Sequence, residues 1–156
     1  MIAIQQRLER FYFDYASCLD EQRYHEWPLF FNQQCCYEIL SRENVSQGLP
    51  VPLMSCYSHG MVSDRVVMLV NKTLTYRKMY WKHLITNVRI EKEEQDVIHS
   101  SANVLLIQSD LEGLSSINIV GTYNDIISTS GAKLAITSRR VVIDSFGIDN
   151  MLAVPI

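Results

Sequence analysis

Basic runs and long apolar runs are both scarce in this sequence. No run of Lys or Arg exceeds two residues, the longest being Arg139-Arg140, and the formal net charge is -3. We therefore expect no nucleic-acid partner, because such binding needs a concentrated positive patch. No apolar run approaches the roughly 20 residues that cross a bilayer, so no membrane partner is expected either. No signal peptide is visible in the first residues.

Cysteine is limited to four positions, which are Cys18, Cys35, Cys36 and Cys56. Cys35 and Cys36 are adjacent on an expected strand, where neighbouring side chains point to opposite faces, so a disulfide between them is not expected. Without an export signal, reduced thiols and a cytoplasmic location are predicted. The alternative is a reactive or metal-binding Cys35-Cys36 pair, but other soft ligands are missing nearby.

The residues that are present predict one globular domain over residues 1–156, with 47% apolar and 20% charged residues. Apolar residues recur at three- and four-residue spacing from Ile4 to Leu19, which predicts a first helix. A short second helix, capped by Asp20, is expected to carry Tyr24 and Trp27 and to end at Pro28. Helical spacing returns over residues 61–73.

β-branched residues dominate the second half of the chain. Strands are predicted over residues 35–40, 83–92, 97–108, 115–128 and 133–144, and a long loop over residues 41–58. The last four strands are most simply an antiparallel meander, and their length implies curvature and bulges. Helices first and a meander second predict an α+β fold, with helices packed on one face of a strongly curved, mostly antiparallel sheet.

This order of elements resembles the cone-shaped fold of nuclear-transport-factor-two-like proteins. Fold alone leaves the function open, since the same fold serves isomerases, dehydratases and binding modules. Several collinear segments resemble, more specifically, the small (beta) subunits of Rieske-type aromatic-ring-hydroxylating dioxygenases, with salicylate 5-hydroxylase and terephthalate dioxygenase as the nearest branches. The segments are 20–27, 30–31, 36–37, 41–44, 48–50, 59–65, 76–83, 87–88, 131–134, 139, 144–145 and 154–156. The chain departs from the family pattern at Lys82, where Arg is frequent, and at Ser138, where an acid commonly precedes the matched Arg139.

The resemblance implies a mainly structural subunit in the bacterial breakdown of a monocyclic aromatic acid. It implies a large (alpha) oxygenase subunit as partner, in a complex of three large and three small chains supplied with electrons by a ferredoxin or reductase. This chain shows no pattern of paired Cys and His for a Rieske cluster, nor two His and a carboxylate for a single iron. We therefore expect no cofactor in it, and the [2Fe-2S] cluster and mononuclear Fe(II) in the large subunit.

The principal alternative is a stand-alone isomerase or dehydratase that uses a pocket in the cone. His83 would be its general base, since proton transfer in such a fold can use a His-Asp pair. A His that bonds within the sheet or at a subunit contact is the simpler interpretation. The aromatic cluster of Tyr24, Trp27, Phe30 and Phe31 is likewise either a pocket lining or core and interface.

No catalytic, cofactor-binding or metal-binding residue is therefore predicted. A subunit interface is expected to draw on the loop 41–58, the segment 76–83 and the C-terminal tail, whose matched residues core packing does not obviously require. The individual interface candidates are Arg42, Tyr80, Lys82, His83 and Arg139.

Overall fold

The computed structural model of the chain describes residues 3–71, 77–145, 147, 148, 152 and 154–156. Its elements in chain order are helix α1 (Ile4–Asp20), the 3₁₀ helix η1 (Tyr24–Phe30), strand β1 (Phe31–Ser41), helix α2 (Arg42–Ser46), strand β2 (Met54–Cys56), helix α3 (His59–Val70), and strands β3 (Tyr80–Glu94), β4 (Val97–Ser109), β5 (Ser115–Ser128) and β6 (Ala135–Ile143). No helix in these ranges is long and apolar enough to span a membrane.

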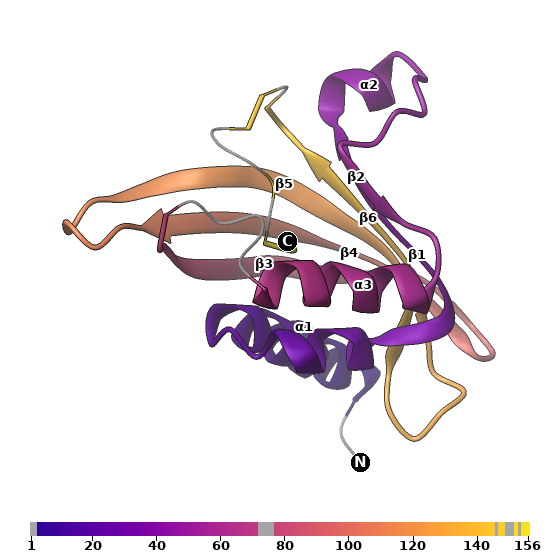
Figure 1. The fold of residues 1–156 in the computed structure, drawn as a ribbon. Coiled ribbons are helices and arrows are strands. Elements are labelled where there is room, and N and C mark those ends of the chain that lie inside the picture. Colours follow the sequence, from indigo (N-terminus) through magenta and orange to yellow (C-terminus); the bar gives the residue numbers. More distant parts are fainter. Residues whose placement is uncertain (1–2, 72–76, 146, 149–151, 153) are drawn as a thin grey trace.

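The strands form one curved sheet in the order β2-β1-β6-β5-β4-β3. Strands β3 to β6 pair antiparallel as the expected meander, whereas β1 pairs parallel with β6. Register shifts interrupt the ladders, which confirms the predicted bulges. Figure 1 shows α1 and α3 against the same face of the sheet, and the β4–β5 hairpin extending past them. The predicted α+β, cone-shaped class is confirmed.

Helix α1 provides much of the core beneath the sheet. Its stripe of Leu8, Tyr12, Tyr15 and Leu19 is completely buried, at the three- and four-residue spacing that the sequence predicts. The polar face of the helix remains exposed. The helix ends at Asp20, whose side chain then reaches the neighbouring strand β3.

The ends of several helices and strands differ from the predicted ones, because polar residues there interrupt the apolar periodicity. Strand β1 begins at Phe31 because Phe31 pairs with Ile136 of β6, and Asn32 donates to Thr137 Oγ1 at 2.8 Å. The predicted loop contains α2, which Ser41 caps by accepting from the Asn44 amide at 3.2 Å, and also β2. Pro28 lies inside η1 instead of ending it. Helix α3 starts at its Ser58 cap and ends at Val70, and residues 72–73 of its predicted range lie outside the described residues.

Strand β3 is an edge of the sheet, and α1 covers its free side. The Asp20 carboxylate accepts from the backbone amide of His83 at 2.9 and 3.2 Å, and Gln5 donates to the Val88 carbonyl at 2.9 Å. Between these points Asn87 has a φ of 54°, within a register shift against β4. These features remove part of the flat, unpaired edge that long strands otherwise expose.

Candidate functional site

A buried ion pair joins two strands at the centre of the cone. Arg139 of β6 lies opposite Asp125 of β5, and its Nε and Nη2 donate to the two carboxylate oxygens at 3.0 and 2.6 Å. Neither side chain is exposed. The Tyr12 hydroxyl donates to the same carboxylate at 2.6 Å and lies 3.0 Å from Ser100 Oγ. Buried charges are tolerated only when they are paired and hydrogen-bonded, and this pair meets that requirement.

Three tyrosine rings surround the guanidinium. The Arg139 Cζ lies 4.1 Å from the ring centre of Tyr123, 4.2 Å from that of Tyr15 and 5.3 Å from that of Tyr12. Burial raises the pKa of all three phenols, which favours their protonated form. Burial would lower the pKa of Arg139, but Asp125 and the tyrosines outweigh it and the pKa is raised overall. The cluster therefore holds one cation, one carboxylate and neutral phenols.

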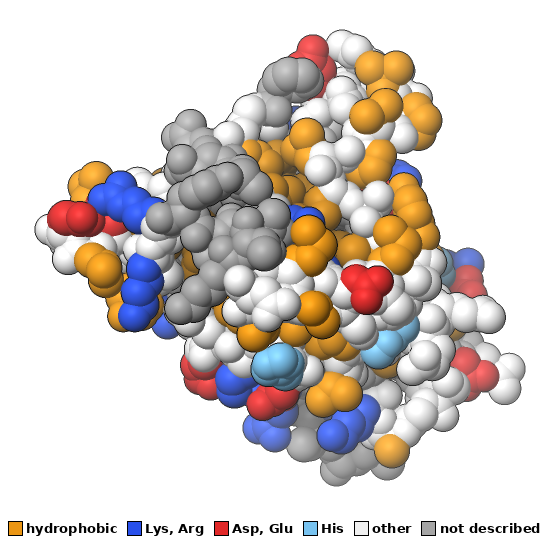
Figure 2. Space-filling model, in the orientation of Figure 1, with side chains coloured by type: hydrophobic (Ala, Val, Ile, Leu, Met, Phe, Trp, Pro, Cys, Tyr) orange, Lys and Arg blue, Asp and Glu red, His pale blue; other side chains and the backbone are white. Residues whose placement is uncertain are grey.

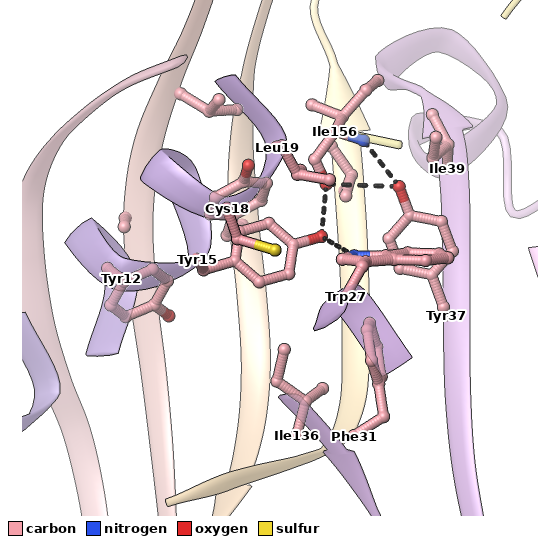
Figure 3. Close-up of a cluster of buried hydrophobic side chains, with 14 of the residues drawn as sticks. Tyr12, Tyr15, Cys18, Leu19, Trp27, Phe31, Tyr37, Ile39, Ile136 and Ile156 are labelled. Atoms are coloured by element: carbon pink, nitrogen blue, oxygen red, sulfur yellow. Dashed lines mark hydrogen bonds between the residues drawn. The ribbon is translucent and has the colours of Figure 1, made fainter. Parts of the chain in front are cut away.

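Ile156 lies in the adjoining aromatic core, where Figure 3 shows it beside Tyr15, Trp27 and Tyr37. The main-chain oxygen of Ile156 accepts from the hydroxyls of Tyr15 at 2.9 Å and Tyr37 at 3.2 Å. The Ile156 amide donates to the Tyr37 oxygen at 2.9 Å, and the Trp27 indole donates to the Tyr15 oxygen at 3.0 Å. Ile156, Trp27, Tyr15 and Tyr37 all have no exposed surface. Trp27 thus belongs to the core, as the simpler interpretation of the aromatic cluster expected.

These side chains and the tail fill the part of the cone that a stand-alone enzyme would need for its substrate. An open groove lies instead outside it, along the first half of α1, where Arg7, Arg10 and Lys133 mix with Asp14 and Glu93. The groove is open to solvent, and of its acids Glu26 is already paired with Arg23 of the same lining. The geometry therefore gives the isomerase or dehydratase alternative no formed pocket within the described residues.

His83 makes a pair with Asp20 under α1. Its Nδ1 lies 2.7 Å from Asp20 Oδ1, in addition to the backbone contact, and its side chain is fully buried. The other ring nitrogen, Nε2, is buried and has no partner among the described residues. Lys82 Nζ approaches Asp20 Oδ2 at 3.8 Å. The carboxylate that the alternative required is thus present, but it serves to bind the end of α1 to β3.

The cysteines and histidines do not form a metal site in the described residues. No group of three or more His, Cys, Asp or Glu side chains there is arranged to hold an ion. His59 contacts the Pro28 carbonyl oxygen at 2.9 Å, and His99 lies 3.9 Å from Glu94. Burial raises the pKa of the Cys18 thiol to about 11 and also raises the pKa of Cys35, Cys36 and Cys56, which disfavours reactive thiolates. Over the part of the chain that the structure describes, the side chains therefore do not fit a Rieske cluster or an oxygenase iron.

The five interface candidates fall into two groups. Arg42, Tyr80 and Lys82 are exposed, with 73% of the Arg42 side chain and 69% of the Lys82 side chain accessible. Arg139 and His83 are buried within the protomer, contrary to what a surface role requires. The reason is that each has a carboxylate partner inside the fold, Asp125 and Asp20 respectively. A direct contact with another subunit is not available to these two side chains in this structure.

An apolar patch on the outer face of the sheet was not anticipated from the sequence. We call it the outer patch, and it consists of Tyr80, Lys82, Leu84, Leu105, Ile107, Ile117 and Val120. The register pairs Leu84 with Leu105, Leu105 with Val120, and Ile107 with both Lys82 and Ile117. Ile117 is 63% exposed, and Leu84 and Val120 are also exposed. The unbroken apolar run 104–107 could have indicated this patch. A strand that is covered on both faces lacks the alternation of apolar and polar residues.

A second group of exposed apolar side chains follows α2 and β2. Val45, Leu49, Val51, Leu53 and Tyr57 are each at least 40% exposed. Figure 2 shows hydrophobic side chains gathered along this segment. Contiguous apolar surface of this kind marks sites of association.

Comparison with known proteins agrees with the sequence pattern. Residues 15–150 match the family model described as ring hydroxylating beta subunit. The chain is 30% identical over 142 residues to the anthranilate 1,2-dioxygenase small subunit of Burkholderia cepacia, covering 91% of this chain and 88% of that protein. It is 25% identical to a beta subunit of the terephthalate 1,2-dioxygenase terminal oxygenase component of a Comamonas species, covering 91% and 92%.

A solved structure shares both fold and sequence with this chain. It is the beta subunit of a candidate aromatic-ring-hydroxylating dioxygenase from Novosphingobium aromaticivorans. The TM-score is 0.89 at 34% identity, with 97% of this chain and 96% of that chain covered. The likeness therefore includes the whole sheet and its helices.

Proposed function

Because the chain belongs to the family of ring-hydroxylating beta subunits, we propose that it serves as the scaffold of a Rieske oxygenase that attacks a monocyclic aromatic acid. It is the small subunit of an aromatic-ring-hydroxylating dioxygenase, and its role is to hold the large, catalytic subunits in place. The observation that carries the scaffold role is the filled cone: Arg139, the tyrosines and Ile156 occupy the space of a substrate pocket.

The partner is a large (alpha) oxygenase subunit, and the complex contains three large and three small chains. The large subunit holds the Rieske [2Fe-2S] cluster and the mononuclear Fe(II), and a ferredoxin or reductase supplies its electrons. The lack of a fitting ligand set among the described residues supports this division. The matched relatives act, by their names, on anthranilate and terephthalate, which supports an aromatic acid as substrate. The complex works in the cytoplasm.

The surface that binds other subunits is the outer patch together with the exposed α2–β2 segment. Arg42, Tyr80 and Lys82 lie on these surfaces, which supports their role at the interface. An exposed apolar sheet face is unfavourable in an isolated chain. Burying it against a partner stabilises the complex by about 25 cal/mol per Å² of apolar surface. His83 and Arg139 support the interface indirectly, because they fix the strands on which it lies.

Co-expression with the large subunit tests this proposal. We expect a mixed hexamer in analytical ultracentrifugation, with all bound iron lost when the large subunit is omitted. Tyr80→Glu and Lys82→Glu each place a new negative charge on the outer patch and should reduce co-purification, while circular dichroism shows an unchanged fold. Gln6→Glu, on the exposed face of α1, is the matched control and should assemble normally.

Two results would contradict the proposal. One is stoichiometric, tightly bound iron in the isolated small subunit. The other is normal assembly of both Tyr80→Glu and Lys82→Glu, which would exclude the outer patch while leaving the family assignment unaffected.

A further inference from the structure

Ile156 is bound in the way that a protein binds a small ligand. Two hydroxyls, from Tyr15 and Tyr37, converge on the same main-chain oxygen of Ile156, and the amide of Ile156 donates back to Tyr37. The isoleucine side chain is wholly buried in the aromatic core. An apolar enclosure with a few converging polar groups is the usual design of a small-molecule site.

The side chains that donate to Ile156 also have contacts that do not involve the tail. The Trp27 indole donates to Tyr15, and the Tyr15 ring lies against the guanidinium of Arg139, at 4.2 Å from its centre. Arg139 is fixed in turn by Asp125. These contacts come from α1, η1, β5 and β6, and none of them uses the tail. The ring of Tyr37 on β1 packs edge-on against Trp27 at 5.5 Å and Phe31 at 6.0 Å, also without the tail. The wall of the chamber is therefore preorganised for an oxygen acceptor.

The wall also has hydrogen-bonding capacity that the tail does not use. Arg139 Nη1 and the Tyr123 hydroxyl are buried and have no partner among the described residues. Both side chains pack against the Tyr15 ring, the Arg139 guanidinium carbon at 4.2 Å from its centre and the Tyr123 ring edge-on at 6.3 Å. Buried donors without partners are rare in folded proteins, and they indicate that a further hydrogen-bond acceptor can bind at this place.

We propose that the centre of the cone is a latent binding chamber for a small aromatic carboxylate, and that Val154–Ile156 is its built-in occupant. The carboxylate of such a ligand takes the place of the Ile156 oxygen between Tyr15 and Tyr37. Its ring takes the place of the isoleucine side chain among the aromatic residues. The unused donors of Arg139 and Tyr123 favour an acid over a neutral molecule of the same shape. This site belongs to the small subunit itself and is independent of assembly with the large subunit.

The tail has few other attachments among the described residues. Arg65 Nη2 donates to the Leu152 carbonyl at 2.5 Å, and Val154 packs with Leu69 of α3. Ile156 thus makes most of the polar contacts of this segment. Removal of residues 154–156 is expected to empty the chamber without cutting any strand of the sheet.

The test compares the full chain with a chain that lacks residues 154–156, using benzoate as the probe and toluene as its neutral counterpart. Titration calorimetry should show saturable benzoate binding to the shortened chain, on the order of tenfold or more tighter than to the full chain. Toluene should bind more weakly than benzoate. A Val-Pro-Ile peptide should compete with benzoate, and Tyr15→Phe with Tyr37→Phe in the shortened chain should abolish the preference for benzoate.

A folded shortened chain that binds no benzoate overturns the proposal, and so does equal binding of toluene and benzoate, which would indicate cavity filling alone. If the shortened chain does not fold, Ile156→Gly in the full chain takes its place. This variant keeps the main-chain oxygen and vacates only the side-chain space, so toluene should bind and benzoate should not. Failure of folded Ile156→Gly to bind toluene, as judged by a shift in melting temperature, also overturns the proposal.

Discussion

Arg139 and Asp125 face each other across strands β6 and β5 as a two-point ion pair with no access to solvent. Their contacts extend to Tyr12, Tyr15 and Tyr123, so that one pair organises much of the core. The pair also lies behind the residues that hold the tail. The contribution of the ion pair to the free energy of unfolding can be distinguished from that of packing by replacing one partner or both.

Asp125→Asn should destabilise the protein by about 3–5 kcal/mol, because it leaves the buried Arg139 charge without its counter-charge. The double variant Asp125→Leu with Arg139→Met should lose less stability than Asp125→Asn, since no charge then remains buried. Urea unfolding followed by circular dichroism measures both. The control is Glu112→Gln in the exposed pair with Arg77, 2.7 Å apart, where little or no loss of stability is expected because solvent screens the pair. Equal losses in core and control would disprove the assigned role.

Stability should fall at alkaline pH through the core tyrosines. Burial raises the pKa of Tyr12, Tyr15, Tyr37 and Tyr123 above the ordinary value of 10.0 in the folded chain. A raised folded pKa gives stability that is fully present below pH 10 and is lost as the pH rises above it, because only the unfolded state ionises freely. The measurement is the absorbance of phenolate at 295 nm as the pH is raised. Four of the eight tyrosines should ionise only when the chain unfolds. Titration of all eight near pH 10 in a chain with native circular dichroism would contradict this prediction.

Gly121 of β5 marks a close approach of two strands. A Cβ atom at this position would lie 2.5 Å from the Val142 carbonyl oxygen, which belongs to the backbone and cannot rotate away. Gly121→Ala should therefore cost about 1–3 kcal/mol of unfolding free energy. Gly131→Ala is the matched control, because its nearest neighbour would be 3.5 Å away. A melting temperature lowered equally by both substitutions would argue against the steric explanation.

The variant His83→Ala distinguishes a structural role of this chain from a catalytic one. In a reconstituted complex, turnover per bound iron should stay within a few-fold of the parent, because the Asp20–His83 pair binds α1 to β3 and lies inside the small subunit. Loss of a general base would instead cost about 100-fold or more. The measurement is product formed from several benzoates, normalised to iron. Asp20→Asn is the companion variant and should behave in the same way, whereas a large loss in fully assembled complex would restore the enzyme hypothesis.

The sequence predicts the helices, the meander and the fold class because their periodicity is local. Helix α1 and strands β4 to β6 lie close to their expected ranges. The burial of Arg139 could not be predicted, since charged side chains are usually exposed and its partner Asp125 is identified only by the register of β5 with β6. The same holds for Ile156, whose contacts with Tyr15 and Tyr37 span more than 100 residues. The resemblance of the tail to the family was visible, but its place in the core was not.

The covered edge of β3 has a consequence for how the subunit is made. A chain whose free strand is already bonded to α1 at His83 and Val88, and is bent at Asn87, offers a poor template for another chain to add a strand. A newly synthesised small subunit is therefore protected along β3 from strand addition by another copy, and its short β2 is the sheet edge that remains for its partner to cover.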